Sequence, residues 1–247
     1  MPSFEDHFSE VAADYAAHRP TYPARLFEIL AATAPARTAA WDCATGNGQA
    51  AVGLAAHFER VVATDASERQ IRHATPHPRV TYRVAPGETP DLPDASVDLV
   101  TVAQAAHWLD LDPFYEAARR AARPAAAIAL WSYGLARVTP DVDEIVRNYH
   151  DVIVGPYWSP RRRFVDDAYR GLPFPFEEID VEPLAMRHEW SLDDYLAYLG
   201  TWSAARAHRR ERGEDPVSLI RADVASAWGS APRVVTWPLG VRLGRVD

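Results

Sequence analysis

Short apolar runs alternate with helix-like segments through the first half of the chain. Strands are predicted at residues 38–45, 60–65, 79–85, 97–104 and 125–133. The run at 97–104 is continuous and apolar, as expected for a strand buried on both faces. Segments with apolar residues at helical spacing separate the predicted strands, at 49–57, 67–74 and 113–122. Because this order requires crossover connections, the pattern predicts a mostly parallel sheet with helices on both faces.

The segments on either side of this core are also patterned. The spacing predicts helices over residues 5–18, 23–34, 141–154, 191–207 and 216–228. It predicts further strands over 176–190 and 234–246, with Pro238 favouring an edge position or a bulge in the last one. Ser191 and Asp194 form a helix-start signature. No segment has the composition of a linker, so we expect a single domain over 1–247.

Composition narrows the class of protein. With 247 residues and 48% hydrophobic content, the chain is long enough for one large α/β core. The net charge is −8 and every basic residue is arginine, which argues against a nucleic-acid partner but leaves room for a local arginine patch that holds a small anion. The single cysteine, Cys43, excludes an internal disulfide. Neither a signal peptide nor a membrane span is evident, so we expect a soluble cytoplasmic protein.

The sharpest local signal is the stretch WDCATGNGQAA, residues 41–51. A strand ends near Asp42, and Gly46 and Gly48 follow before the next helix. Glycines in such a turn let a ligand approach the backbone N–H groups. Asp65 ends the next strand, where a carboxylate can accept the two hydroxyls of a ribose.

Two kinds of cofactor fit this turn. The spacing Gly46, Gly48, Ala51 also satisfies the dinucleotide fingerprint, and Asp65 suits NAD as well as S-adenosylmethionine. Asp42 favours the second cofactor, because a carboxylate before the glycines repels a pyrophosphate and attracts an ammonium group. A glycine-rich turn without any ligand is the simplest structural alternative.

The motif Asp42-Cys43-Ala44-Thr45-Gly46-Asn47-Gly48 resembles the first motif of class I S-adenosylmethionine-dependent methyltransferases. Residues 87–108 are similar to the third and fourth strand region of that family. Four stretches, 104–115, 155–162, 193–204 and 236–246, are similar to its trans-aconitate methyltransferase branch. The resemblance implies a Rossmann-like fold with a seven-stranded sheet, an antiparallel last strand and a helical cap. It also implies an N-terminal helical lid at 1–35, a cofactor-binding core at 36–134, and substrate-binding insertions at 135–175 and 191–230.

The resemblance assigns the cofactor residues one by one. Ala44 replaces the first glycine of the motif, a change that we expect to be tolerated at negative φ. Pro86 stands where many relatives carry an aspartate near the adenine amine, so adenine would be held by the backbone of Gly87 and Glu88. The predicted residues for S-adenosylmethionine and its product S-adenosylhomocysteine are Asp42, Ala44, Gly46, Asn47, Gly48, Asp65, Ala66, Gly87, Glu88 and Gln104.

A methyl acceptor should bind beyond the carboxyl ends of the strands. His107 and Trp108 follow the fourth predicted strand, and each has a structural alternative as a capping or core residue. Tyr157, Trp158 and Arg161 combine aromatic surface with a guanidinium group that can bind an acid. The predicted acceptor-binding residues are Tyr15, Arg19, Tyr22, Trp108, Tyr157, Trp158, Arg161, Trp202 and Arg206.

The expected reaction is methyl transfer to an oxygen of a small acid, of the trans-aconitate type. An ionised carboxylate needs no base, whereas a hydroxyl acceptor needs one, and His107 is the candidate. A phosphonate or natural-product hydroxyl, an NAD-dependent oxidoreductase and a non-catalytic S-adenosylmethionine-binding protein remain as alternatives. The sequence shows no metal-ligand spacing, so we expect no metal, and it leaves the oligomeric state open.

Overall fold

The computed structural model describes residues 19–246, and these divide into two compact units. The sheet unit comprises residues 21–134, 163–184 and 239–246. The helical unit comprises residues 19–20, 135–162 and 185–238. The expectation of one domain with a lid and two insertions stays a prediction.

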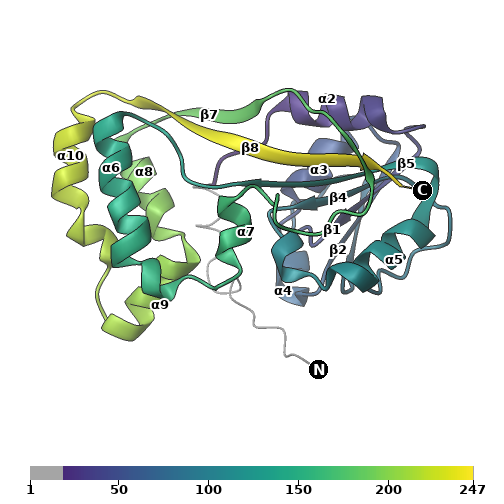
Figure 1. Cartoon of the computed structure of the whole chain (residues 1–247), viewed down its shortest axis with the longest axis horizontal. Helices are drawn as coiled ribbons and strands as arrows, with labels where there is room; N and C mark the ends of the chain where they lie inside the picture. Colours follow the sequence, from purple (N-terminus) through teal and green to yellow (C-terminus); the bar gives the residue numbers. More distant parts are fainter. Residues whose placement is uncertain (1–18, 247) are drawn as a thin grey trace. The chain divides into compact units, whose positions relative to one another are not determined.

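Five parallel strands lie side by side in the order β3-β2-β1-β4-β5. Figure 1 labels β1, β2, β4 and β5 among them. The five strands are β1 (Ala39–Cys43), β2 (Arg60–Asp65), β3 (Val80–Val84), β4 (Val97–Ala103) and β5 (Ala122–Tyr133). Each coincides with a predicted strand to within a few residues. β8 (Arg233–Arg245) pairs antiparallel with β5, which confirms the antiparallel last strand of a Rossmann-like fold.

Within residues 19–246 the sheet has eight strands, so the predicted number of seven is wrong. The segment predicted as a strand over 176–190 forms two strands, β6 (Glu177–Ile179) and β7 (Leu184–Trp190), and both pair with β8. Pro183 stands just before β7. A proline lacks the N–H that a strand ladder needs and restricts the residue before it, which accounts for the interruption.

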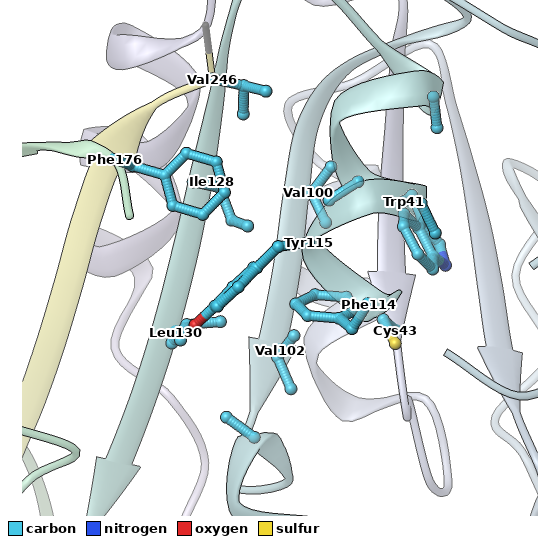
Figure 2. Packing of buried hydrophobic residues seen from close by; sticks show 14 of the residues in the cluster. Trp41, Cys43, Val100, Val102, Phe114, Tyr115, Ile128, Leu130, Phe176 and Val246 are labelled. Carbon is cyan, nitrogen blue, oxygen red and sulfur yellow. The ribbon is translucent and has the colours of Figure 1, made fainter. Parts of the chain in front are cut away.

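Two apolar cores cover the faces of the sheet. Alternate side chains of a strand point to opposite faces, so Ala40 belongs to one core and Trp41 to the other. The first core packs against α2 (Ala24–Thr33) and α3 (Gln49–Ala55). The second packs against α5 (Leu111–Ala121), and Figure 2 shows Phe114 and Tyr115 of that helix among the strand residues. β1 and β4 are thus buried along almost their whole length, as the continuous apolar run of β4 predicts, whereas β3 at the edge of the sheet is half-exposed.

The remaining helices are mostly those predicted. The sheet unit also contains α4 (Glu68–Arg72), and α7 (Arg162–Asp166), which no pattern predicted, begins at its border. The helical unit contains α6 (Pro140–Asn148), a π-helical turn η2 (Tyr149–Ile153), η3 (Gly155–Tyr157), α8 (Leu192–Gly200), α9 (Ser203–Arg212), η4 (Pro216–Leu219) and α10 (Arg221–Trp228). Along the part of the chain that is described, no helix is long and apolar enough to cross a bilayer.

The predicted helix over 191–207 is two helices. Its start is confirmed, because Ser191 and Asp194 form a reciprocal capping box at the head of α8. Trp202 then takes an extended backbone conformation and becomes the N-cap of α9. Its indole is buried against Tyr149 and Tyr198, at ring distances of 5.6 and 5.9 Å. This tertiary packing outweighs the helical spacing of the sequence.

A buried carboxylate joins the amino ends of three strands. One oxygen of Asp98 in β4 accepts the backbone N–H groups of Thr38 and Ala39, each at 2.9 Å, beside β1. The other oxygen accepts Nη1 of Arg123 in β5, also at 2.9 Å. Asp98 is fully buried, whereas the side chain of Arg123 is 31% exposed, so the carboxylate is shielded from water and its ionic partner is only partly shielded.

We expect Asp98→Asn to lower the free energy of unfolding by about 3 kcal/mol, because the amide nitrogen cannot accept and the partner charge of Arg123 stays partly buried. Urea unfolding measures this change. Asp94→Asn is the matched control, since its carboxylate is 79% exposed and meets Arg120 only at the surface. Equal, small effects of the two substitutions would contradict the bracing role of Asp98.

Candidate cofactor and acceptor sites

The strand order places the cofactor candidates at one point of the sheet. β1 lies between β2 and β4. From β1 the chain adds β2 and β3 on one side of the sheet, and then β4 and β5 on the other side. Ligands of open α/β sheets bind outside the carboxyl ends of the strands at such a switch point. The residues that follow β1, β2 and β4 are 44–48, 66–67 and 104–108, and all belong to the sheet unit.

Asp42 of β1 is held inside this edge. It is fully buried, and its Oδ2 and Oδ1 accept the hydroxyls of Thr45 at 2.5 Å and Thr101 at 2.8 Å. Thr101 is its partner in the ladder between β1 and β4. Burial raises the pKa of Asp42 to about 6, against the opposing effect of these two hydroxyls and of the backbone N–H of Ala51. The structure therefore shows that Asp42 ties the turn to β4 from inside, and its contact with the ammonium group of the cofactor stays a prediction.

The two strands at the switch point end in the same strained conformation. Ala44 after β1 has φ +53°, so the condition of a negative φ, under which the replacement of glycine was expected to be tolerated, is not met. Gln104 after β4 has φ +55°. Neighbouring strands fix both residues, because Thr45 N–H donates to Thr64 O and Gln104 N–H donates to Trp131 O. A left-handed non-glycine residue costs about 1–2 kcal/mol, and such residues concentrate at functional sites.

The two glycines of the turn differ in what surrounds them. Both have positive φ, +58° at Gly46 and +86° at Gly48. A Cβ on Gly48 would lie 2.2 Å from the hydroxyl oxygen of Tyr82, so this glycine permits close packing on β3. A Cβ on Gly46 would meet no atom within 4 Å. Gly46 is therefore the position where an added side chain would extend over the turn.

Asp65 fastens the turn to the end of β2. Its Oδ2 accepts the N–H of Gly46 and its Oδ1 accepts the N–H of Ser67, both at 2.8 Å. A carboxylate can accept about four hydrogen bonds, so these two are compatible with further hydroxyl donors. Contact with a ribose stays a prediction, and the structure adds that the same carboxylate orients the N–H of Gly46.

The other predicted cofactor residues lie around this turn. Asn47 O accepts the N–H of Thr75 at 2.9 Å, and Ala66 is exposed next to Asp65. Gly87 lies against β1, because a Cβ there would be 2.7 Å from Cys43 Sγ.

The side chains of Glu88 and Gln104 are oriented by backbone groups. Glu88 Oε1 accepts the N–H of Asp110, and Gln104 Nε2 donates to Tyr133 O at 3.0 Å. Gln104 Oε1 is buried with no partner among the described residues. This oxygen at the end of β4 fits the amine donors of S-adenosylmethionine.

His107 lies at the end of β4 with a partner that the sequence did not reveal. It belongs to the short helix η1 (Ala106–Trp108), is 8% exposed, and its Nδ1 lies 2.9 Å from Tyr169 Oη. The exposed ring of Trp108 packs against it at 4.7 Å. Tyr169 stands 62 positions further along the chain, so no local pattern connects it with His107.

The helical unit brings two predicted acceptor residues together. Trp158 and Trp202 lie 5.7 Å apart, and the ring of His150 contacts both. Tyr149 also packs on Trp202. We call Tyr149, His150, Trp158, Tyr198 and Trp202 the aromatic cluster.

Two arginines stack on the aromatic cluster. Arg162 Cζ lies 4.5 Å above the ring of Trp158, and Arg19 Cζ lies 5.6 Å from the ring of Tyr198. The structure thus places Arg162, next to the predicted Arg161, on the aromatic surface. Arg206 lies one turn beyond Trp202 and donates its N–H to Trp202 O, as the helical spacing predicts.

Sequence reasoning missed Tyr149, His150 and Tyr198. His150 Nδ1 pairs with Asp151 at 2.6 Å, while its Nε2 is buried without a partner among the described residues. The run Asn148-Tyr149-His150-Asp151 lies at the end of a predicted helix, where the change to π-helical geometry has no signal in the local pattern.

The remaining predicted acceptor residues lie elsewhere. Tyr22 belongs to the sheet unit, where its ring packs edge-on against Trp131 at 5.5 Å. Tyr157 of the helical unit accepts Nε of Arg212 at 2.9 Å and is not a member of the aromatic cluster. Tyr15 lies outside the described residues. Within residues 19–246, no three His, Cys, Asp or Glu side chains gather as metal ligands do.

Comparisons with known proteins place this geometry in a family. Residues 41–130 match the model of a methyltransferase domain. A protein of Dictyostelium discoideum, provisionally named a methyltransferase, is 34% identical over 229 residues, which cover 91% of this chain and 87% of that protein. A solved structure from Anaeromyxobacter dehalogenans, provisionally named a type II methyltransferase, is 50% identical with a TM-score of 0.87, over 92% of this chain and 98% of that chain.

A more distant structure shares only the fold. Phosphoethanolamine N-methyltransferase 2 of Haemonchus contortus, solved with S-adenosylhomocysteine, is 16% identical with a TM-score of 0.50, over 98% of this chain and 60% of that chain. Taken with the switch-point geometry, these matches define the class: the chain belongs to the class I S-adenosylmethionine-dependent methyltransferases. S-Adenosylmethionine is the cofactor of this family, and the alternative of an NAD-dependent oxidoreductase is not supported.

We expect Gly46→Ala to weaken S-adenosylhomocysteine binding at least about tenfold in calorimetry, because the methyl group extends over the cofactor turn. Gly213→Ala is the matched control. Gly213 also has positive φ, +74°, and open space at Cβ, but it caps α9 in the helical unit. Each substitution should cost about 1 kcal/mol of stability from backbone strain. Equal cofactor affinities of the two variants would contradict the assigned turn.

The raised pKa of Asp42 predicts how stability depends on pH. Because its pKa is about 6 in the folded state and 3.8 ordinarily, the native state binds this proton more tightly than the unfolded chain. Stability should therefore fall as pH rises from about 4 through 6. Relative to Asp42→Asn, the wild type should lose on the order of 3 kcal/mol over this window.

Urea unfolding at several pH values measures this difference. Thr101→Val, which removes one hydrogen-bond donor to the carboxylate, should make the fall larger. Parallel stability curves for the wild type and Asp42→Asn would show that Asp42 does not titrate in this range.

Proposed function

We propose that this methyltransferase methylates an oxygen of a small, flat acid of the trans-aconitate type. The cofactor supplies an electrophilic methyl group on a sulfonium. The protein must then hold the acceptor oxygen in line and exclude water. An ionised carboxylate is already nucleophilic at neutral pH, so this acceptor needs only binding and orientation.

The observation that carries the proposal is the stack of Arg162 on Trp158 within the aromatic cluster. Stacking holds the guanidinium plane in a fixed direction, which suits bidentate binding of a carboxylate. The neighbouring rings of His150 and Trp202 offer apolar walls to a flat, unsaturated body. The similarity of residues 155–162 and 193–204 to the trans-aconitate branch supports the same acceptor class.

A hydroxyl acceptor is the second candidate, and His107 favours it. A hydroxyl has to lose a proton during transfer, and His107 is a buried, hydrogen-bonded imidazole at the carboxyl end of β4. The two candidates differ in how much they need a base. His107→Gln keeps an N–H donor but removes the base, so it should lower kcat by about tenfold or less with a carboxylate acceptor and by about 10²- to 10⁴-fold with a hydroxyl acceptor.

The acceptor class can be tested by incubating the protein with radiolabelled S-adenosylmethionine and each member of a panel of di- and tricarboxylates, phosphonates, phenols and amines. We expect the labelled methyl group on a carboxylate. The product is then a methyl ester, from which mild base releases the label as methanol. Arg162→Gln should raise the acceptor KM about tenfold with S-adenosylhomocysteine affinity unchanged. Arg163→Gln is the matched control, because Arg163 stacks in the same way on Phe164, outside the aromatic cluster.

Label on phenols or amines and on no acid would overturn the proposal. An equal rise in KM for both arginine variants would show that Arg162 has no special part in acceptor binding.

A further inference from the structure

A strained turn in the sheet unit determines where the hydroxyl group of Tyr169 lies. Ala168 and Tyr169 follow α7 and have φ +57° and +63° in succession. Two adjacent non-glycine residues in the left-handed region persist only where their surroundings determine them. Tyr169 is fully buried, and its hydroxyl lies 2.9 Å from Nδ1 of His107.

The surroundings that determine this turn come from β8. Arg242 Nη1 donates to the carbonyl oxygens of Tyr169 at 3.1 Å and Leu172 at 2.7 Å. Its guanidinium also pairs with Glu178 of β6 and lies 4.6 Å from the ring centre of Phe174. The Arg242 side chain is only 13% exposed, so these contacts are partly shielded from water.

Gly240 of β8 secures the other half of the turn. A Cβ at this position would lie 2.3 Å from Ala168 Cβ and 3.0 Å from its Cα, so the glycine allows the strained turn to rest directly on the strand. Gly240 and Arg242 are in register with Ser132 and Leu130 of β5. The turn is thus fixed to β8, which pairs with β5, and β5 in turn pairs with β4, the strand that precedes His107.

We propose that Tyr169 is a positioning residue that orients His107 and selects which of its nitrogens carries the proton. A phenol is a better hydrogen-bond donor than acceptor, so Tyr169 donates to Nδ1. The neutral imidazole then carries its proton on Nε2. In this form His107 is a donor toward an ionised oxygen of the acceptor, which deepens the proposed function and rests on it.

The tautomer of His107 is measurable without any acceptor. Proton-coupled ¹⁵N spectra of the full chain with S-adenosylhomocysteine distinguish the two neutral forms, and the signal that disappears in His107→Gln assigns this histidine among the nine. We expect the Nε2-protonated form in the wild type. Tyr169→Phe, which keeps the ring, should shift His107 to a mixture of tautomers and lower kcat about 3- to 10-fold at unchanged cofactor affinity.

Tyr115→Phe is the matched control. Tyr115 is equally buried in the sheet unit, and its hydroxyl donates to Pro173 O at 2.7 Å, away from His107. It should lose similar stability and leave both the tautomer and kcat unchanged. Arg242→Lys keeps the positive charge but loses the guanidinium contacts that hold the turn, so it should reproduce the tautomer shift more weakly. It also replaces Tyr169→Phe as the test if that variant does not fold.

The experiments distinguish failure of the positioning role of Tyr169 from failure of the proposed acceptor class. An Nδ1-protonated His107 in the wild type, or identical His107 spectra in the wild type, Tyr169→Phe and Arg242→Lys, would overturn the positioning role. Correct tautomers together with labelling of phenols or amines and of no acid would instead overturn the proposed acceptor and leave the role of Tyr169 standing.

Discussion

A carboxylate buried between two parallel strands sets the geometry of the cofactor edge. Asp42 receives hydroxyl bonds from Thr101 across the ladder and from Thr45 in the turn. Both hydroxyl groups compensate for the burial of the Asp42 carboxylate. They thereby join the ends of β1 and β4 at the point where the strand order reverses. The raised pKa of Asp42 is the energetic sign of this arrangement, since burial outweighs the donors that favour the charged form.

Strain is distributed around the same edge. Ala44, Gln104 and Tyr169 all take left-handed backbone conformations, and each is fixed by bonds from a neighbouring strand. The first two shape the ends of β1 and β4, and the third brings a hydroxyl to His107. A rigid sheet thus supports backbone geometry that an isolated loop would not adopt, which is a recurring property of functional sites.

Local pattern was sufficient for the framework of the fold. The five parallel strands and the helix start at Ser191 follow from apolar periodicity and capping chemistry, and the antiparallel direction of β8 follows from the family resemblance. The glycines of the cofactor turn and Asp65 were also identifiable, because strand-end turns carry a short signature. The split before β7 was missed, although Pro183 is a local signal for it.

Long-range contacts account for what the sequence did not reveal. The break at Trp202 arises from packing on Tyr149 and Tyr198, and the internal role of Asp42 depends on Thr101, 59 positions away. The contact of Arg162 with Trp158 depends on the turn that leads into α7, and acceptor binding by Arg161 stays a prediction. Contacts of this kind leave no periodic pattern in the sequence from which they could be predicted.

Calorimetry with two ligands tests the central role of Asp42 most directly. S-Adenosylhomocysteine and the analogue that lacks its amino group are titrated into the wild type and Asp42→Asn. If Asp42 braces the turn from inside, the substitution changes the affinity for both ligands by the same factor. If the substitution instead weakens binding of S-adenosylhomocysteine alone and spares the analogue, Asp42 contacts the ammonium group directly and is not an internal brace.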